Sequence, residues 1–478
     1  MSRSLNRRRF LRSSALGAAA AMVAACQPKI VEVEKEVTKV VEKVVKETVM
    51  VEGTPQVVEK KVTQVVKEIV TATPAPKGRV QVLATINHSL ASYEPFIYEE
   101  AAEKAPGIEL KMDQTSASGG WDAYADNLIT RIAGGEGLDV IYCAIEGMPL
   151  LADKKAIIAM DPYIEADAEA RADFEEDIHP KLWDTLTWKG KRMMIPYGWN
   201  NMLNWWNTAV FAELGIEDPE DGWDWDDFVQ LCMELASVKG EDDDRYAYVW
   251  FDSAFGMAPW FFNNDTSWVT PDWMNSNMDD PKVAETLQFL SDLILKHKVS
   301  PQLAGFDEQG NFHAGNLAMR GCGRWCTGQA KNNDFTDYNF TYYAHKSGPL
   351  KTVVGVGGWS TVTMCQHKDE AWEAIKVLDS FEQGLRFINT TGSVPARRSV
   401  SETDDFLQGD HLSPVADMRM FYESLDGAAV VPSPPNFNVV DPLLRRWYAQ
   451  LWNGDITVDE LVVGAHEELQ AEMDKIRE

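Results

Sequence analysis

Aromatic and polar side chains on expected strand ends and crossover segments are the residues best suited to bind a small polar molecule. Eleven of the seventeen tryptophans lie between Trp183 and Trp273. A flat ring packs against a patch of C–H groups, while polar side chains hydrogen-bond to hydroxyl groups. The candidates are the aromatic residues Tyr197, Trp199, Trp325 and Trp359 and the polar residues Glu146, Asn200, Asp252 and Arg397. This combination favours a site for a sugar or oligosaccharide.

The compact motifs of common catalytic centres are missing from the sequence. It contains no Gly-x-Ser-x-Gly, Gly-x-x-x-x-Gly-Lys or His-Glu-x-x-His pattern, and its eight histidines are scattered. We therefore predict no catalytic residue, no metal and no cofactor. Carboxylates are abundant, so a secreted carbohydrate-active enzyme with two opposed carboxylates stays open as an alternative.

Cys322 and Cys326 are four residues apart, without the second pair of ligands that a zinc site needs. A disulfide between them is compatible with a location outside the cytoplasm. Because unpaired cysteines are among the most buried residues, we favour two buried free thiols.

Strands and helices alternate in the region that must position the first of these residues. Residues 79–85, 108–112 and 138–142 are predicted strands, and residues 93–104 and 121–132 are predicted helices, the second ending at a pair of glycines. This order favours an α/β sheet covered by helices, with ligand-binding loops at the carboxyl ends of its strands. Residues 115–120 and 146–148 lie on such loops. At the other end of the chain, Thr457 and Glu460 predict a capping box at the start of a helix.

Five sequence blocks, in order, resemble those of the family 1 extracellular solute-binding proteins. They are residues 190–199 (GKRMMIPYGW) with 203–207 (LNWWN), 211–215 (FAELG) with 223–228 (WDWDDF), 312–319 (FHAGNLAM) with 323–325 (GRW), 355–360 (GVGGWS) and 392–397 (GSVPAR). The resemblance covers nearly all of residues 79–478. It implies that the protein delivers its ligand to the permease of an ABC importer, and a glycan- or peptide-binding surface module without a transporter stays open as a further alternative.

The resemblance also implies a two-lobed periplasmic-binding-protein-like α/β fold with a hinge of crossing segments. The first lobe would take residues 79–198 and return at 351–398. The second lobe would take residues 199–350 and 399–478. A ligand that contacts both lobes favours the closed state by its differential affinity for that state.

The N-terminal residues resemble an export signal. Arg7 and Arg8 belong to a basic stretch that resembles a twin-arginine signal, and they precede an apolar run too short to span a bilayer. Residues 23–26 (VAAC) resemble a lipobox, which would place a lipid on Cys26 after removal of residues 1–25. We therefore expect an extracytoplasmic protein anchored to the cell membrane through Cys26.

Residues 26–78 have a composition unlike the rest of the chain. Val, Lys, Glu and Thr dominate and no aromatic residue occurs, so the segment cannot bury a core of its own. We predict a tether whose neighbouring Lys and Glu could support transient helix or a weak coiled coil, although the β-branched valines argue against a stable isolated helix. A stalk that self-associates is the less favoured alternative. The whole chain carries a formal net charge of −29, which argues against nucleic acid as a partner.

Overall fold

The computed structural model describes residues 35–51, 54–70, 78–88, 94–117, 119–237 and 245–477. The chain divides into two compact units, Met1–Gly78 and Arg79–Glu478. The candidate export signal, with Arg7, Arg8 and Cys26, lies outside the described residues.

The first unit contains a long β-hairpin. Strands β1 (Lys35–Val51) and β2 (Thr54–Val70) pair antiparallel along their whole length. Over these described residues the structure has strands and no helix, in keeping with the many β-branched residues of the segment, which favour extended backbone.

The larger sheet of the second unit runs in the order β14-β8-β13-β5-β3-β4, with β15 beside β13. Its strands are β3 (Val80–Ile86), β4 (Ile108–Gln114), β5 (Val140–Ala144), β8 (Ile195–Asn200), β13 (Val353–Thr361), β14 (Val394–Pro395) and β15 (Ala429–Val430). Strand β3 is parallel to β4 and β5, whereas β13 is antiparallel to β5 and β8. The parallel part arises from strand–helix–strand units, as the sequence predicts.

Helices and a small hairpin surround this sheet. They are α2 (Glu94–Lys104), α3 (Trp121–Ala133), α4 (Met148–Asp153), α5 (Asp161–Ala166), α6 (Ala168–Asp177), α7 (Pro180–Thr185), β6 (Thr187–Trp188), β7 (Lys191–Arg192), α14 (Lys368–Leu378) and α15 (Phe381–Thr391). Helix α14 packs on β3, β4, β5 and β13. Its buried face, which includes Trp372 and Ile375, covers one side of the sheet.

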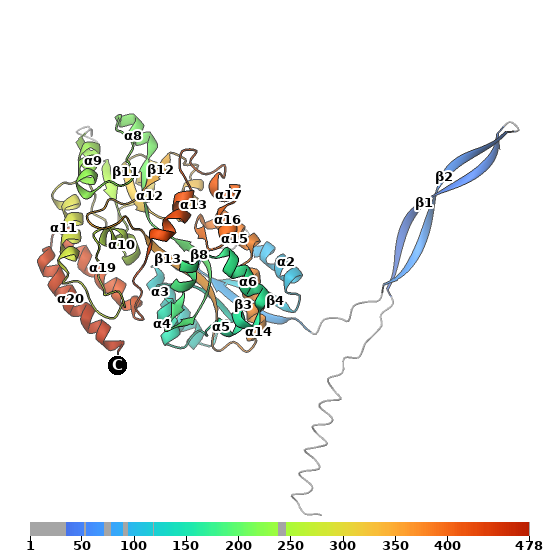
Figure 1. Ribbon diagram of the computed structural model, residues 1–478, viewed down its shortest axis with the longest axis horizontal. Helices are drawn as coiled ribbons and strands as arrows, with labels where there is room; N and C mark the ends of the chain where they lie inside the picture. Colours follow the sequence, from blue (N-terminus) through green and yellow to red (C-terminus); the bar gives the residue numbers. More distant parts are fainter. Residues whose placement is uncertain are drawn as a thin grey trace, which may run out of the picture. The chain divides into compact units, whose positions relative to one another are not determined.

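The smaller sheet runs in the order β10-β11-β9-β12. Its strands are β9 (Leu203–Asn207), β10 (Tyr246–Val249), β11 (Leu317–Cys322) and β12 (Tyr338–Thr341). The accompanying helices are α8 (Thr208–Leu214), α9 (Trp225–Ser237), α10 (Ala254–Phe262), α11 (Pro281–Leu295), α12 (Glu308–His313) and α13 (Trp325–Lys331). Figure 1 shows this sheet with α8 and α9 at one end of the second unit, and β3 and β4 with α5 and α14 at the other.

The chain crosses between the two sheets at residues 201–202 and 342–352, and residues 431–436 lead from the last strand of the larger sheet to the C-terminal helices. The two crossings are hydrogen-bonded to one another: the backbone N–H of Met202 donates to the hydroxyl of Thr352 (3.2 Å), and that hydroxyl donates to the carbonyl of Met202 (2.6 Å). Segments that connect two lobes and hold each other in this way are suited to act as a hinge.

The return of the chain differs from the predicted boundary at residue 399. Helices α16 (Arg398–Ser401) and α17 (Asp404–Leu407) pack on α15, and β15 pairs with β13 of the larger sheet. After α18 (Arg419–Glu423), a 3-10 turn (Ser424–Gly427) leads into β15. The part of the chain near residues 398–430 therefore extends the larger sheet's side instead of the smaller one.

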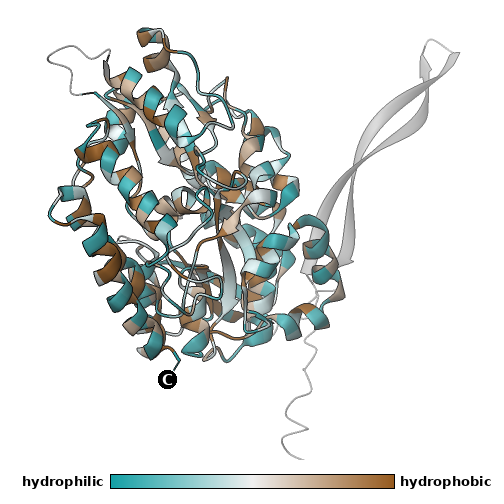
Figure 2. Cartoon of the chain, turned by 60° about the vertical axis from the view of Figure 1, so that its left-hand side comes forward, coloured by the Kyte–Doolittle hydropathy of each residue, from teal (hydrophilic) through white to brown (hydrophobic). Residues whose placement is uncertain are grey.

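Two long helices complete the chain. Helix α19 (Phe437–Asn453) packs on α3, α11 and α20 (Val458–Lys475), and α20 packs on α11. The predicted capping box is confirmed, since the side chains of Thr457 and Glu460 bond to each other's backbone N–H. Figure 2 shows hydrophobic and hydrophilic residues alternating around the helices of this unit, as expected where one face is buried. Within the described ranges, no helix combines the length and apolar character needed to cross a bilayer.

Candidate functional site

A cavity of about 350 Å³ lies between the two sheets. Residues near the larger sheet and residues near the smaller sheet both line it. They are Asn87, Trp121, Tyr142, Ala144, Glu146, Gly198, Trp199, Asn200, Gly355, Gly357 and Ser393 on the first side, and Phe251, Ser253, Phe255, Gly256 and Trp325 on the second. Six aromatic rings and a few polar groups therefore share one concave surface.

The carboxyl ends of parallel strands supply much of the first side. Asn87 follows β3, Tyr142 lies in the middle of β5, and Glu146 lies two residues beyond the end of β5. Trp121 is the first residue of α3, and its ring lies 6.1 Å from that of Tyr142. Open α/β sheets bind ligands at this edge because the connecting loops meet there.

The second side comes from the turn between β10 and α10 and from the start of α13. Ser253 caps α10, with its hydroxyl accepting a hydrogen bond from the N–H of Gly256 (3.2 Å). Trp325 lies about 6 Å from the rings of Phe251 (6.1 Å) and Phe255 (6.0 Å). These three rings form an apolar wall opposite the larger sheet.

Two glycines of β13 leave room for the aromatic rings. A Cβ atom added to Gly357 would lie 2.0 Å from the hydroxyl oxygen of Tyr142, and one added to Gly355 would lie 2.7 Å from a ring carbon of Phe255. Side chains at these positions would therefore displace rings that line the cavity. The glycine-rich sequence of β13 allows strand and rings to approach closely.

Glu146 is the one carboxylate among the described lining residues. Its side chain is only 4% exposed, and its Oε2 atom has no hydrogen-bond partner. Burial raises the pKa of Glu146 to about 7, with a smaller contribution in the same direction from Asp441. The Oδ1 atom of Asn200, on the same wall, is also buried without a partner. Two lining residues thus carry buried hydrogen-bond acceptors that no described group of the protein satisfies.

Asp252 is placed behind this wall. It accepts a hydrogen bond from the indole of Trp452 (3.0 Å), and burial raises its pKa to about 6. Asp441 accepts a hydrogen bond from the N–H of Ala254 (2.8 Å), which ties α19 to the start of α10. The prediction that Asp252 lines the site is therefore not met, because its carboxylate is engaged with α19.

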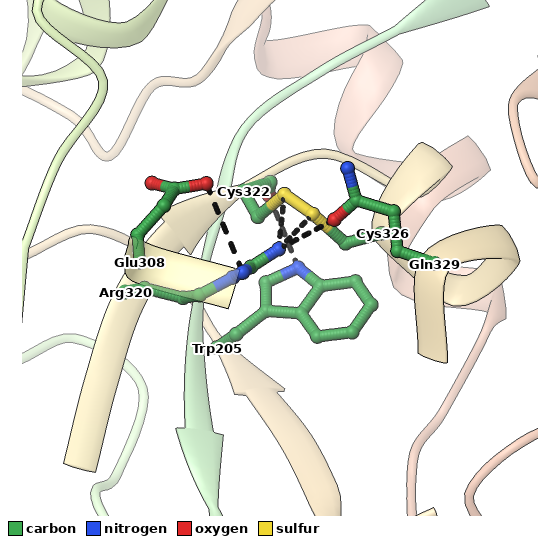
Figure 3. The surroundings of a disulfide bond; sticks show 6 residues. All are labelled: Trp205, Glu308, Arg320, Cys322, Cys326 and Gln329. Carbon is green, nitrogen blue, oxygen red and sulfur yellow. Dashed lines mark hydrogen bonds and ion pairs between the residues drawn. A yellow bond between two sulfur atoms is a disulfide. The ribbon is translucent and has the colours of Figure 1, made fainter. Parts of the chain in front are cut away.

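Trp325 is held by the junction between β11 and α13, which a disulfide between Cys322 and Cys326 closes. The expectation of two free thiols is wrong: the strand and the helix bring these cysteines within bonding reach. The Nη2 atom of Arg320 donates to both sulfur atoms, 3.3 Å from that of Cys322. Figure 3 shows this guanidinium between Glu308 and the disulfide.

Arg324 ties the junction between β11 and α13 to two later segments of the chain. It donates to the carbonyls of Gly392 and Phe406, both at 2.8 Å, and its guanidinium lies 3.9 Å from the ring centre of Phe406. Gly323 has no space for a side chain, since an added Cβ would lie 1.8 Å from the Trp325 ring. The hydrogen bonds of Arg324 and the close packing of the indole against Gly323 therefore both hold Trp325 in place.

Four of the eight candidate residues line this cavity: Glu146, Trp199, Asn200 and Trp325. Trp199 is almost fully buried, and its indole N–H donates to the carbonyl of Pro395 (3.0 Å). This hydrogen bond points the N–H edge of the indole toward β14. The Trp199 ring also forms part of the cavity wall.

Tyr197 and Trp359 do not line the cavity. Their rings are 5.5 Å apart and pack with Tyr142 and Phe387 inside the body, and the Tyr197 hydroxyl donates to the carbonyl of Gln383. Simple alternation along β8 would place Tyr197 on the same face as Trp199. The register of β8 against β13 shifts beside Tyr197, however, since Gly357 pairs with Gly198 and Gly358 with Pro196.

Arg397 also lies outside the cavity between the sheets. Its guanidinium pairs with Asp173 (2.7 Å), Asp177 (3.2 Å) and Asp379 (3.5 Å), and it lines a separate, charged hollow beside α6 and α14. This arginine joins three segments of the first lobe and has no contact with the cavity between the sheets.

The sequence interpretation missed several lining residues, chiefly Asn87, Trp121, Tyr142, Phe251 and Phe255. The sequence assigns Trp121 and Tyr142 to a helix face and a buried strand, and they are indeed the first residue of α3 and the central residue of β5. Phe251 lies two residues after β10, and Phe255 is the second residue of α10. Their place after a strand was the signal available, and it applied equally to Asp252 between them.

Comparisons with known proteins agree with this geometry. The sequence model of the bacterial extracellular solute-binding proteins matches residues 87–383. The fold is similar to an ABC substrate-binding protein from Listeria monocytogenes solved with cycloalternan (18% identity, TM-score 0.73, 83% of this chain and 99% of that chain). It is also similar to a cyclic α-maltosyl-1,6-maltose binding protein from Arthrobacter globiformis (17%, 0.68, 83% and 100%) and to a maltose-bound protein from T. maritima (17%, 0.68, 82% and 99%). The expected two-lobed fold is confirmed.

Proposed function

Because the chain belongs to the family of bacterial extracellular solute-binding proteins, we propose that it captures a sugar or short oligosaccharide for an ABC importer. The observation that carries the proposal is the cavity between the sheets, where six aromatic rings face Asn87, Glu146 and Asn200. Rings bind the C–H faces of a pyranose and the polar groups bind its hydroxyls. Of the structural neighbours, one was solved in complex with cycloalternan, one with maltose, and one is a cyclic α-maltosyl-1,6-maltose binding protein.

Binding without turnover is the activity that this site supports. Glycoside hydrolysis commonly uses two carboxyl groups that flank the scissile bond. Glu146 is the single carboxylate among the described residues of the cavity wall. A solute would therefore be held and released unchanged.

We further propose that the candidate signal delivers the protein across the membrane and that Cys26 carries a lipid. The supporting pattern is the arginine pair at residues 7 and 8, followed by the lipobox-like residues 23–26. Residues 26–78, including the β-hairpin, would then connect the anchor to the binding unit. Loss of metabolic lipid labelling and of membrane association in Cys26→Ala tests this arrangement.

A thermal-shift screen of the purified chain against sugars, polyols, amino acids and peptides tests the function. A ligand at about 100 times its dissociation constant adds about 2.7 kcal/mol to the free energy of unfolding. We expect a sugar to raise the melting temperature and to be recovered chemically unchanged. A response confined to peptides or amino acids, or hydrolysis of the bound sugar, would contradict the proposal.

Trp325→Ala provides the matched variant for that ligand. Removal of a ring that lines the cavity is expected to weaken binding by about tenfold or more. Trp188→Ala, on the hairpin β6–β7 away from the lining residues, serves as the control and should retain the affinity. Equal affinity in the wild type and Trp325→Ala would place the ligand elsewhere.

A further inference from the structure

The charge of the cavity wall is one-sided. Glu146 is its only acidic residue, and no lysine, arginine or histidine occurs among the described residues that line it. The Glu146 carboxylate is buried and its Oε2 atom has no partner. An unpaired buried acceptor costs free energy that a ligand recovers when it supplies a donor.

Among the described residues, no basic group acts on Glu146. The group that acts on it electrostatically from another element is a second acid, Asp441 of α19, and Cys143 of β5 interacts with it from its own side. Arg445, on α19, is already paired with Asp441 (2.9 Å) and Asp122 (2.9 Å). A solute that carries a positive charge would therefore complete the site by pairing with the ionised form of Glu146.

The remaining wall also favours a cation. Trp121, Tyr142, Trp199, Phe251, Phe255 and Trp325 present aromatic rings to the cavity, and ring faces attract cations. An ammonium group has three N–H donors, enough for both Glu146 Oε2 and Asn200 Oδ1. A solute carboxylate or phosphate would instead be repelled by Glu146 across a medium of low dielectric constant.

We propose that the solute is an amino sugar whose protonated amine contacts Glu146, and that the site discriminates against acidic sugars. This inference rests on the proposed function, since it specifies the chemical class of the sugar. Glu146 would act as the specificity-determining residue.

Matched probes separate the inference from the function on which it rests. Calorimetry at pH 7.5 compares four forms of one sugar: glucose, glucosamine, N-acetylglucosamine and glucuronate. The corresponding four forms of galactose make a second series. Cellobiose and the β-1,4-linked glucosamine dimer make a matched pair of disaccharides. We expect the amine to bind about tenfold more tightly than its neutral parent, as a charged hydrogen bond predicts, and the acid to bind most weakly. N-Acetylglucosamine and N-acetylgalactosamine, which keep the nitrogen but lose its charge, should behave like the neutral sugars.

Glu146→Gln keeps the shape and removes the charge. In this variant the preference for the amine should disappear, so that the amine and its neutral parent bind with similar affinities. Glu213→Gln, on the exposed surface of α8, is the matched control and should keep the preference. An amine preference that survives in Glu146→Gln would overturn the inference.

Proton exchange provides a second readout. Because the pKa of Glu146 is raised to about 7, this carboxyl is largely protonated at pH 5.5, and binding of an ammonium must release a proton near pH 6.5. The preference for the amine should therefore shrink from pH 7.5 to pH 5.5, and the binding enthalpy near pH 6.5 should depend on the buffer in the wild type but not in Glu146→Gln.

The outcomes are distinct. A neutral sugar that binds as tightly as its amine refutes the inference and leaves the sugar-binding function standing. Binding of no sugar, amine or neutral, in this set and in the wider screen refutes both.

Discussion

Arg397 lies among the carboxylates of Asp173, Asp177 and Asp379, and its own side chain is nearly buried. Asp379 is fully buried, and burial raises its pKa to about 8 against the opposing effect of Arg397. A buried charge that loses its partner destabilises a protein strongly, so this arginine is a structural residue of the first lobe.

Replacement of this arginine should lower stability in a pH-dependent way. We expect Arg397→Met to cost roughly 3 kcal/mol near pH 7, with unchanged ligand affinity. Since Asp379 is protonated more readily in the folded state than in the unfolded state, its contribution to stability is lost as pH rises through its folded pKa. Without Arg397 that pKa rises further, so the deficit should be larger at pH 8.5 than at pH 5.5.

Melting temperatures of the wild type and Arg397→Met at both pH values measure this effect. Arg398→Met, whose side chain is more than half exposed, is the control and should change little. Loss of ligand affinity in well-folded Arg397→Met would instead return this residue to the binding site.

At the scale of elements, the junction of β11 and α13 connects a disulfide to the cavity. Cys326 is the neighbour of Trp325, and Cys322 ends β11, so the bond sets the angle at which α13 leaves the strand. The indole of Trp205 in β9 donates to the carbonyl of Cys322 (3.1 Å), which extends the rigid region into the centre of the smaller sheet (Figure 3).

Removal of the disulfide should affect both stability and binding. The loop it closes is short, so the Cys322→Ser/Cys326→Ser variant should lose only about 2 kcal/mol through the unfolded state. We expect ligand affinity to fall several-fold as well, because Trp325 is then held less firmly. Calorimetry measures the affinity, and denaturation measures the stability.

Two controls make that result specific. Treatment with a reductant should not weaken the double variant further, and Trp325→Ala should lose no additional affinity when the disulfide is also removed. An unchanged affinity in the folded double variant would show that Arg324 and the glycines alone hold the indole.

At the scale of the whole binding unit, the cavity is divided between two lobes that only a few crossing segments connect. Both sides contribute lining residues, so a ligand that contacts both favours the conformation in which they are close. We expect the pivot near Met202 and Thr352, where two crossing segments are hydrogen-bonded to each other.

Closure of the lobes is measurable with one spin label on each. Lys111→Cys places a label at an exposed position of β4 in the larger sheet. Glu213→Cys places the second label at an exposed position of helix α8, which accompanies the smaller sheet. The distance distribution should become narrower and shift when saturating sugar is added, and the shift should be smaller at equal ligand concentration in Trp325→Ala. Identical distributions with and without bound ligand would contradict a hinge mechanism.

The sequence by itself determined the family, the alternation of strands and helices at the start of the second unit, and the capped terminal helix. These features follow from local periodicity, from capping chemistry and from the order of short motifs. The sequence also predicted four of the lining residues, because loop positions after strands or between glycines limit where a side chain points. They are Glu146, Trp199, Asn200 and Trp325.

Only the tertiary structure decided which aromatic and charged residues share the cavity. Tyr197 lies two residues before Trp199 on the same strand, yet only Trp199 lines the cavity. Tyr197 packs with Trp359 and Phe387 instead, because the placement of its ring depends on which segments cover the sheet. The carboxylates that surround Arg397 come from segments more than 200 residues earlier in the chain as well as from nearby Asp379. Such contacts join residues distant in sequence, and local patterns carry no information about them.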